Sequence, residues 1–332
     1  MDSSPPPLRR VVIAAVLTTA VVLALGGCGG NERPSAGSGG TGAGHQLKVV
    51  ATTTQLGDFV RNVGGDGIQL TQVLQPNSDP HEYEPRPNDV ESTAGADIVF
   101  ESGDNLDRWM GKLIQESGGK PTVVDLGAAV PVKLPGESEG PEASQYDPHW
   151  WHDPANAVAA VEKIRDTLAG AEPARAEAFR VNATAYLGKL QALQHGITKC
   201  LDPIPPSARQ LVTSHDAFNY FAKRFDITVV GAVIPSQTTQ AQPSSKELVE
   251  LTKLVRDKHV AAVFPEESLN PALARRIAEE TGARADLVLY GDTLGPAGSS
   301  GDTYLRMEQA NADAMATAFS GGKSGCAISG IG

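Results

Sequence analysis

The stretch from Glu172 to Lys199, EPARAEAFRVNATAYLGKLQALQHGITK, decides the architecture of this chain, because it predicts one long helix between two sets of β-rich segments. Pro173 stands where the first turn of a helix tolerates proline, since the missing N–H needs no partner there. Apolar side chains then recur at helical spacing, and they are Ala176, Phe179, Ala183, Tyr186, Leu190 and Leu193. Such a helix is about 42 Å long, at about 1.5 Å per residue. We expect it to run along two lobes as one rigid connection that limits hinge motion.

Strand-like and helix-like segments alternate on both sides of this helix, which is typical of parallel α/β sheets. Before the helix we predict strands at Leu47–Thr53, Gln69–Leu74, Asp97–Glu101 and Thr122–Leu126, and a helix at Asn105–Glu116. After it we predict strands at Gln210–Thr213, Ile227–Val233, Val260–Phe264 and Asp286–Tyr290, and helices at Asp216–Phe225, Ser244–Lys258 and Pro271–Thr281. The length of 332 residues also suits two domains. The predicted fold class is therefore α/β, with two parallel-sheet lobes connected by one long rigid helix.

The boundaries of these patterns divide the chain into an N-terminal lobe (47–153), a connecting helical segment (154–200), a C-terminal lobe (201–320) and a C-terminal tail (321–332). Residues 1–27 are predicted to be a signal peptide, because Arg9-Arg10 precede an apolar run that ends at Leu25 and is shorter than the bilayer span of about 20 residues. Leu25-Gly26-Gly27-Cys28 resembles a bacterial lipobox, in which the cysteine becomes lipidated; the alternative is an ordinary signal peptide followed by a chance cysteine. Residues 28–46 are then the lipidated cysteine and a flexible Gly/Ser-rich tether.

The charge and the cysteine content of the chain indicate which partners it can bind and in which compartment it works. The net charge of −11 argues against nucleic acid, because neutralising phosphates requires a basic surface. If Cys28 carries lipid, Cys200 and Cys326 remain as a candidate disulfide in an oxidising space, although two leftover cysteines can also stay unpaired. We expect a monomer outside the cytoplasm, held to the outer face of the cell membrane by its lipid anchor.

Three histidines and one aspartate follow predicted strands in both lobes. They are His81, His149, His215 and Asp292. In open α/β sheets, ligands bind beyond the carboxyl ends of the strands. Two residues from each lobe should therefore converge on one interlobe cleft and form a metal site. Any single histidine is more often a core or surface hydrogen-bonding residue than a ligand, and the candidates gain weight from their shared position.

Residues beside these histidines are expected to support them. Pro80 and Pro148 stiffen the two ligand loops. Asp147, Asp153 and Asp216 are candidates to accept the second ring N–H of an imidazole and fix its tautomer.

Four motifs in order resemble the substrate-binding proteins of zinc and manganese ABC transporters. They are Asp79-Pro80-His81-Glu82-Tyr83-Glu84-Pro85, Asp147-Pro148-His149-Trp150 with Asp153-Pro154, Thr213-Ser214-His215-Asp216, and Gly291-Asp292-Thr293-Leu294. Phe264-Pro265-Glu266 and Thr303-Tyr304 also agree with this family. The resemblance covers about Lys48 to Phe319, and it implies a metal held between two lobes, an ABC permease with its ATPase as partners, and Glu266 near the ligands.

Two features depart from that family. His152 stands where the family usually has an apolar residue, so it is an alternative ligand, a hydrogen-bond partner of a ligand, or a loop histidine, and we favour the last. The segment Leu134–Tyr146 is short and acidic and lacks histidine, so we expect a solvated loop in place of the His-rich metal-capturing loop of many zinc-specific relatives.

Three classes of function remain open. The first is capture of a divalent metal for uptake. Zn²⁺ is the preferred ion, because three imidazoles and one carboxylate suit tetrahedral zinc, whereas Mn²⁺ favours oxygen-rich sites. Within the family, a glutamate at the position of His215 would have indicated manganese. The second class is a zinc hydrolase, which a site with four protein ligands disfavours because no coordination position stays open. The third is a surface adhesion lipoprotein with a structural metal. No catalytic residues are assigned, and we do not expect an enzyme.

Overall fold

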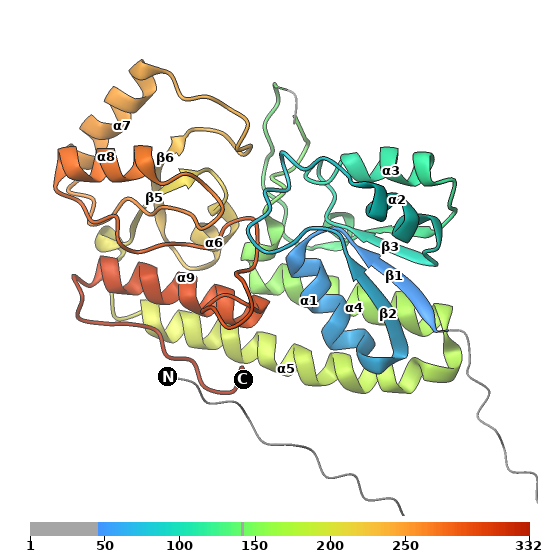
Figure 1. Cartoon of the computed structure of the whole chain (residues 1–332). Helices are drawn as coiled ribbons and strands as arrows, with labels where there is room; N and C mark the ends of the chain where they lie inside the picture. The colour runs from blue at the N-terminus through green and yellow to red at the C-terminus, as the bar shows by residue number, and fades with distance from the viewer. Residues whose placement is uncertain (1–45, 141–142) are drawn as a thin grey trace, which may run out of the picture. The chain divides into compact units, whose positions relative to one another are not determined.

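The computed structural model describes residues 46–140 and 143–332 (Figure 1). The predicted signal peptide, Cys28 and the tether lie outside the described residues. No helix within 46–140 or 143–332 has the length and apolar character that crossing a membrane requires.

The N-terminal lobe is built on a parallel sheet with the strand order β2-β1-β3-β4. Its strands are β1 (Leu47–Ala51), β2 (Ile68–Gln72), β3 (Ile98–Glu101) and β4 (Thr122–Asp125), and its helices are α1 (Thr54–Gly64), α2 (Pro87–Ala94) and α3 (Trp109–Ser117). Successive side chains of β1 point to opposite faces, as a pleated strand requires. Val49 and Ala51 join the core that contains Leu56 of α1, whereas Val50 packs with Met110 of α3 on the other face. These strands confirm the four that the sequence predicted.

The C-terminal lobe contains β5 (Gln210–His215) and β6 (Thr228–Ile234), which pair in parallel. Its helices are α6 (Asn219–Arg224), α7 (Ser245–Asp257), α8 (Ala272–Thr281) and α9 (Tyr304–Phe319). The predicted strands at 260–264 and 286–290 are wrong as continuous strands. The first segment lies beside β5 through the isolated parallel bridge of Thr213 with Phe264, and the second lies beside the first through the isolated parallel bridge of Glu266 with Leu289. Pro265 interrupts the pairing there, because proline has no backbone N–H to donate to a ladder.

Two antiparallel helices connect the lobes, α4 (Pro154–Ala171) and α5 (Ala176–Leu201). Asp153 caps α4 by accepting a hydrogen bond from the Ala155 N–H at 2.9 Å. Glu172 leaves the helical conformation at φ −131° and ψ 79°, because a residue before proline disfavours it. The long helix therefore begins at Ala176, after a 3-10 turn at Pro173–Arg175, and not at Glu172 as the sequence predicted.

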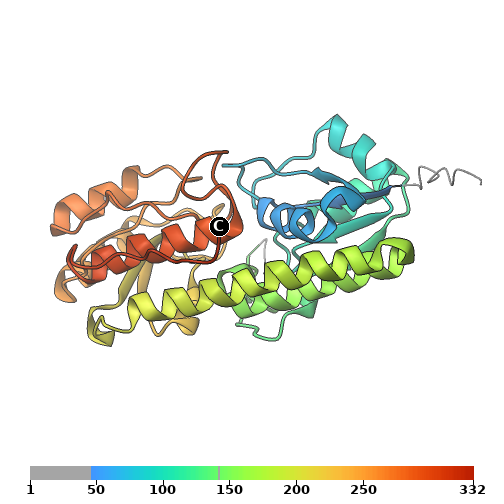
Figure 2. The ribbon, with the colours of Figure 1, turned by 90° about the horizontal axis from the view of Figure 1, so that it is seen from below.

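Helix α5 is about 39 Å long, at about 1.5 Å per residue, and it contacts α1 of the first lobe and α9 of the second. Figure 2 shows it running beneath both lobes. Its predicted apolar positions from Phe179 to Leu193 are buried, whereas Ala176 at the start of the helix is only half-buried. At its end, Cys200 forms a disulfide with Cys326, with the two Cα atoms 5.4 Å apart.

Candidate metal centre

The four predicted ligands lie together between the lobes. His81 follows β2, His149 precedes the 3-10 turn Trp150–His152, His215 is the last residue of β5, and Asp292 follows the bridge at Leu289. Each offers one ligand atom, and these atoms all lie within 4.8 Å of one another. All four residues are buried, with His81 the most exposed at 5%. Among the residues that the structure describes, this is the only such group.

The imidazoles all direct their Nε2 atoms at the Asp292 carboxylate. His149 Nε2 lies 3.3 Å from Asp292 Oδ1. On the other oxygen, Oδ2, His215 Nε2 lies at 3.3 Å and His81 Nε2 at 3.5 Å. The Nε2 atoms of His149 and His215 are 3.3 Å apart. Three nitrogens and a carboxylate around one point form a set that suits a tetrahedral transition metal ion.

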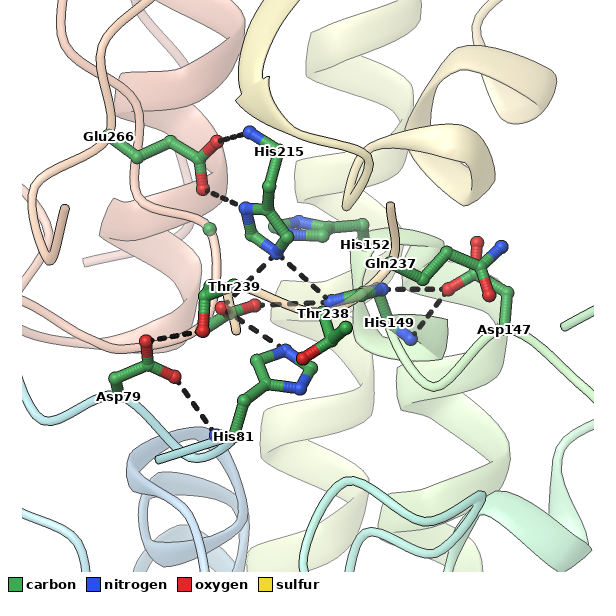
Figure 3. Close-up of polar contacts among 12 residues, drawn as sticks. Asp79, His81, Asp147, His149, His152, His215, Gln237, Thr238, Thr239 and Glu266 are labelled. Carbon is green, nitrogen blue, oxygen red and sulfur yellow. Dashed lines mark hydrogen bonds and ion pairs between the residues drawn. The ribbon is translucent and has the colours of Figure 1, made fainter. Parts of the chain in front are cut away.

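Two further carboxylates orient the rings (Figure 3). Asp147 Oδ1 lies 2.8 Å from His149 Nδ1 and also accepts the His149 backbone N–H at 3.0 Å. Glu266 Oε2 lies 2.9 Å from His215 Nδ1, and its other oxygen accepts the His215 backbone N–H at 2.9 Å. A carboxylate on Nδ1 leaves Nε2 as the ligand atom. Gly291 is required beside this pair, because a Cβ there would collide with the Glu266 carboxylate.

The expected partners Asp153 and Asp216 do not hold an imidazole in this way. Asp153 caps α4 and pairs with Arg224, whose Nη2 lies 2.6 Å from Asp153 Oδ2. Asp216 bonds to Asn219 and donates its backbone N–H to the Ser236 carbonyl at 3.0 Å. Each follows its histidine in the sequence, where the backbone carries its side chain away from the ring. Glu266, 51 residues along the chain from His215, supplies the contact instead.

The charges of this group favour a bound cation. Burial alone would lower the pKa of His215, but the carboxylates of Glu266 and Asp292 raise it well above its usual value. The pKa of His149 is likewise raised, because Asp147 and Asp292 outweigh burial. Burial alone would raise the pKa of Asp292, yet the surrounding histidines, His215 foremost, lower it well below its usual value. The raised pKa values of His149 and His215 mean that a binding cation competes with protons at these two imidazoles.

His152 lies outside this group and is not the loop histidine that we favoured. It is fully buried, its Nδ1 lies 2.7 Å from Glu308 Oε1 of α9, and its ring stacks on Phe218 at 4.4 Å between centroids. Sequence reasoning missed Glu308, which lies 156 residues away in the chain. His195 is exposed on α5 and His259 is exposed after α7, and neither belongs to the four-residue group. His45 lies outside the described residues.

Trp151 packs the centre from one side. Its ring lies 5.4 Å from that of His149, and its Nε1 donates to the Gly291 carbonyl at 3.2 Å. Trp150 donates to the Ser102 carbonyl at 3.0 Å. Both side chains are fully buried, so they pack at the junction of the lobes.

Comparison with known proteins gives one consistent family. Residues 49–318 match the family described as zinc-uptake complex component A, periplasmic. The manganese-binding lipoprotein MntA of Bacillus subtilis (strain 168) is 32% identical over 303 residues, which cover 90% of this chain and 95% of the relative. The iron-binding protein YfeA of Yersinia pestis is 31% identical over 274 residues, covering 82% and 86%.

Solved structures agree with this family. The periplasmic zinc binding protein TroA from Treponema pallidum superposes with a TM-score of 0.75 at 27% identity, covering 82% of this chain and 99% of that one. The predicted α/β fold with two lobes is thereby confirmed. The chain belongs to the zinc-uptake component A family, the metal-binding substrate-binding proteins of ABC transporters.

Proposed function

We propose that this protein captures Zn²⁺ outside the cytoplasmic membrane, anchored there by lipid on Cys28, and delivers it to an ABC permease and its ATPase for uptake. One observation carries the choice of zinc. The buried group offers three imidazole Nε2 atoms and one carboxylate, and such a nitrogen-rich set favours zinc over manganese. Four protein ligands also leave no open position for hydrolysis.

Manganese is the second candidate. Both oxygens of Asp292 face histidines, Oδ1 toward His149 and Oδ2 toward His215, so a carboxylate that binds through both oxygens would raise the coordination number. Relatives named as manganese-binding cover most of this chain. The affinity measured in vitro does not identify the ion transported in the cell, because zinc binds more tightly than manganese at almost any such site.

Growth under chelation tests the proposal. We expect a strain lacking this gene to stop growing in chelator and to be rescued by added zinc or by the wild-type gene. The His215→Ala gene should fail to rescue, because it removes one ligand, whereas His195→Ala should rescue fully, because it removes an exposed imidazole of α5. Rescue by manganese and not by zinc would overturn the metal assignment, and rescue by the His215→Ala gene would overturn the site.

A further inference from the structure

A short loop of the C-terminal lobe lies across the metal centre and bonds to the loops of His81 and His215. This covering loop, residues 236–240, follows β6. It is anchored on its own lobe where the Ser236 carbonyl accepts the Asp216 N–H, one residue after His215. Its side chains also bond to its own backbone, as Ser236 Oγ accepts the Thr238 N–H at 3.2 Å. The loop is therefore a preformed unit.

The covering loop bonds to the N-terminal lobe at two carboxylates. Thr239 Oγ1 donates to Asp79 Oδ2 at 2.6 Å, and Asp79 Oδ1 in turn accepts the His81 backbone N–H at 2.9 Å. Figure 3 shows Thr239 beside Asp79 and above His81. Gln240 Nε2 donates to the carbonyl of His81 itself. The loop thus holds the backbone of one ligand from the opposite lobe.

The second carboxylate is Glu137, in the acidic segment 134–146. Its two oxygens accept from the covering loop, Oε2 from Ser236 Oγ at 3.0 Å and Oε1 from the Gln237 N–H at 2.8 Å. Gln237 Nε2 also donates to the Pro135 carbonyl at 3.3 Å. The acidic segment closes directly onto the His149 loop, because the Asp147 N–H donates to the Leu134 carbonyl at 3.0 Å. Glu137 therefore ties the covering loop to a second ligand loop.

The bonds between Glu137 and the covering loop are partly buried and border a cavity. A cavity of about 670 Å³ is lined by both segments, with Glu137, Glu139, Ser236 and Gln240 among its lining residues. The bonds can exchange for bonds to water without unpacking a hydrophobic core, so this contact can open before either lobe is disturbed. Hydrogen bonds to a charged acceptor are about twice as strong as neutral ones, which makes Glu137 the strongest point of the contact on the acidic segment.

We propose that Glu137 is a positioning residue that keeps the covering loop closed over the bound metal and so sets the rate at which the metal leaves. This inference rests on the proposed function and adds a role to the acidic segment, which lacks histidine. Capture by the four ligands does not depend on Glu137. Retention does, because the covering loop must detach from Glu137 and Asp79 before the ion reaches solvent.

Release of zinc into excess chelator, followed by stopped flow on the purified protein, tests this role. We expect Glu137→Ala to release zinc at least about tenfold faster, the scale of lost hydrogen bonds to a charged group. Glu137→Gln should release zinc at a rate between those of wild type and Glu137→Ala, because an amide can still accept from the Gln237 N–H and donate to the Ser236 hydroxyl, but through weaker neutral bonds. Glu139→Ala removes the same charge from an exposed position of the same segment and should stay within about twofold of wild type.

The release rates of these variants support or contradict the role of Glu137. If Glu137→Ala binds zinc and releases it at the wild-type rate, the proposal is wrong. If Glu137→Gln and Glu139→Ala are as fast as Glu137→Ala, loss of charge explains the effect, and the positioning role is also wrong. Thr239→Val removes only the bond to Asp79 and should accelerate release even if Glu137→Ala fails to fold; an unchanged rate there contradicts the proposal. Wild-type protein that binds no zinc would instead refute the proposed function itself.

Discussion

Glu266 is the largest cause of the raised pKa of His215 in the metal centre. Its carboxylate lies 2.9 Å from Nδ1 and, together with Asp292, holds the pKa of His215 well above the usual value despite burial. The raised pKa means that protons compete with a metal for this imidazole. Apparent zinc affinity should therefore rise with pH up to that raised pKa and fall as the pH is lowered.

Replacing Glu266 by Gln should weaken zinc binding about 10- to 100-fold at pH 7.5, because a ligand loses the carboxylate that orients it and increases its basicity. The difference should shrink on acidification, since without Glu266 the pKa of His215 is lower and fewer protons compete with the metal. Calorimetry in buffers of different ionisation enthalpy would also show fewer protons released per zinc at neutral pH. Asp216→Asn is the matched control, because it removes a neighbouring charge that does not contact the ring. An equal loss in both variants would contradict a specific role for Glu266.

At the scale of elements, the C-terminal tail is fastened to the end of α5. Ile328 packs against Gly196, where an added Cβ would meet its side chain, and Ile331 is 7% exposed. The Cys200–Cys326 disulfide closes a loop with a sequence separation of 126 residues. Its removal in a Cys200→Ser, Cys326→Ser protein should lower the free energy of unfolding by about 4–5 kcal/mol in the chain-entropy treatment.

Denaturant unfolding of the metal-free protein measures that change. Zinc affinity should stay within about twofold of wild type, because neither cysteine belongs to the four-residue metal group. Two free thiols in the unfolded oxidised wild-type protein, or a loss of stability below about 1 kcal/mol, would show that the disulfide does not stabilise the fold.

The spacing of apolar residues predicted helices and strands well where the local sequence alone determines the secondary structure. The apolar spacing of α5 and the β-branched runs of β1 and β3 are of this kind. It failed at 260–264, where Pro265 limits the pairing to isolated bridges. Whether a β-like run pairs as a continuous strand depends on the neighbouring segments as well as on its own residues. The partners of the histidines were hardest to predict. Asp147 lies two residues from His149, whereas Glu266 and Glu308 reach their histidines across 51 and 156 residues, and spacing along the chain carries no signal for such contacts.

At the scale of the whole molecule, neither lobe contains a complete metal site. His81 and His149 come from the N-terminal lobe, and His215 and Asp292 come from the C-terminal lobe. Helix α5 contacts both lobes and fixes the distance between the two half-sites. The same junction carries polar bonds that cross between lobes, among them Thr54 Oγ1 accepting the Leu294 N–H at 2.8 Å. We therefore expect metal binding to require both lobes together.

Anomalous diffraction from crystals of the protein, stripped by chelator and reloaded with one equivalent of zinc, tests this claim most directly. We predict one anomalous peak above the zinc absorption edge, about 2.0–2.2 Å from the Nε2 atoms of His81, His149 and His215 and from an oxygen of Asp292. A peak at any other residues, or binding that leaves one of these four outside the coordination shell, would contradict the account.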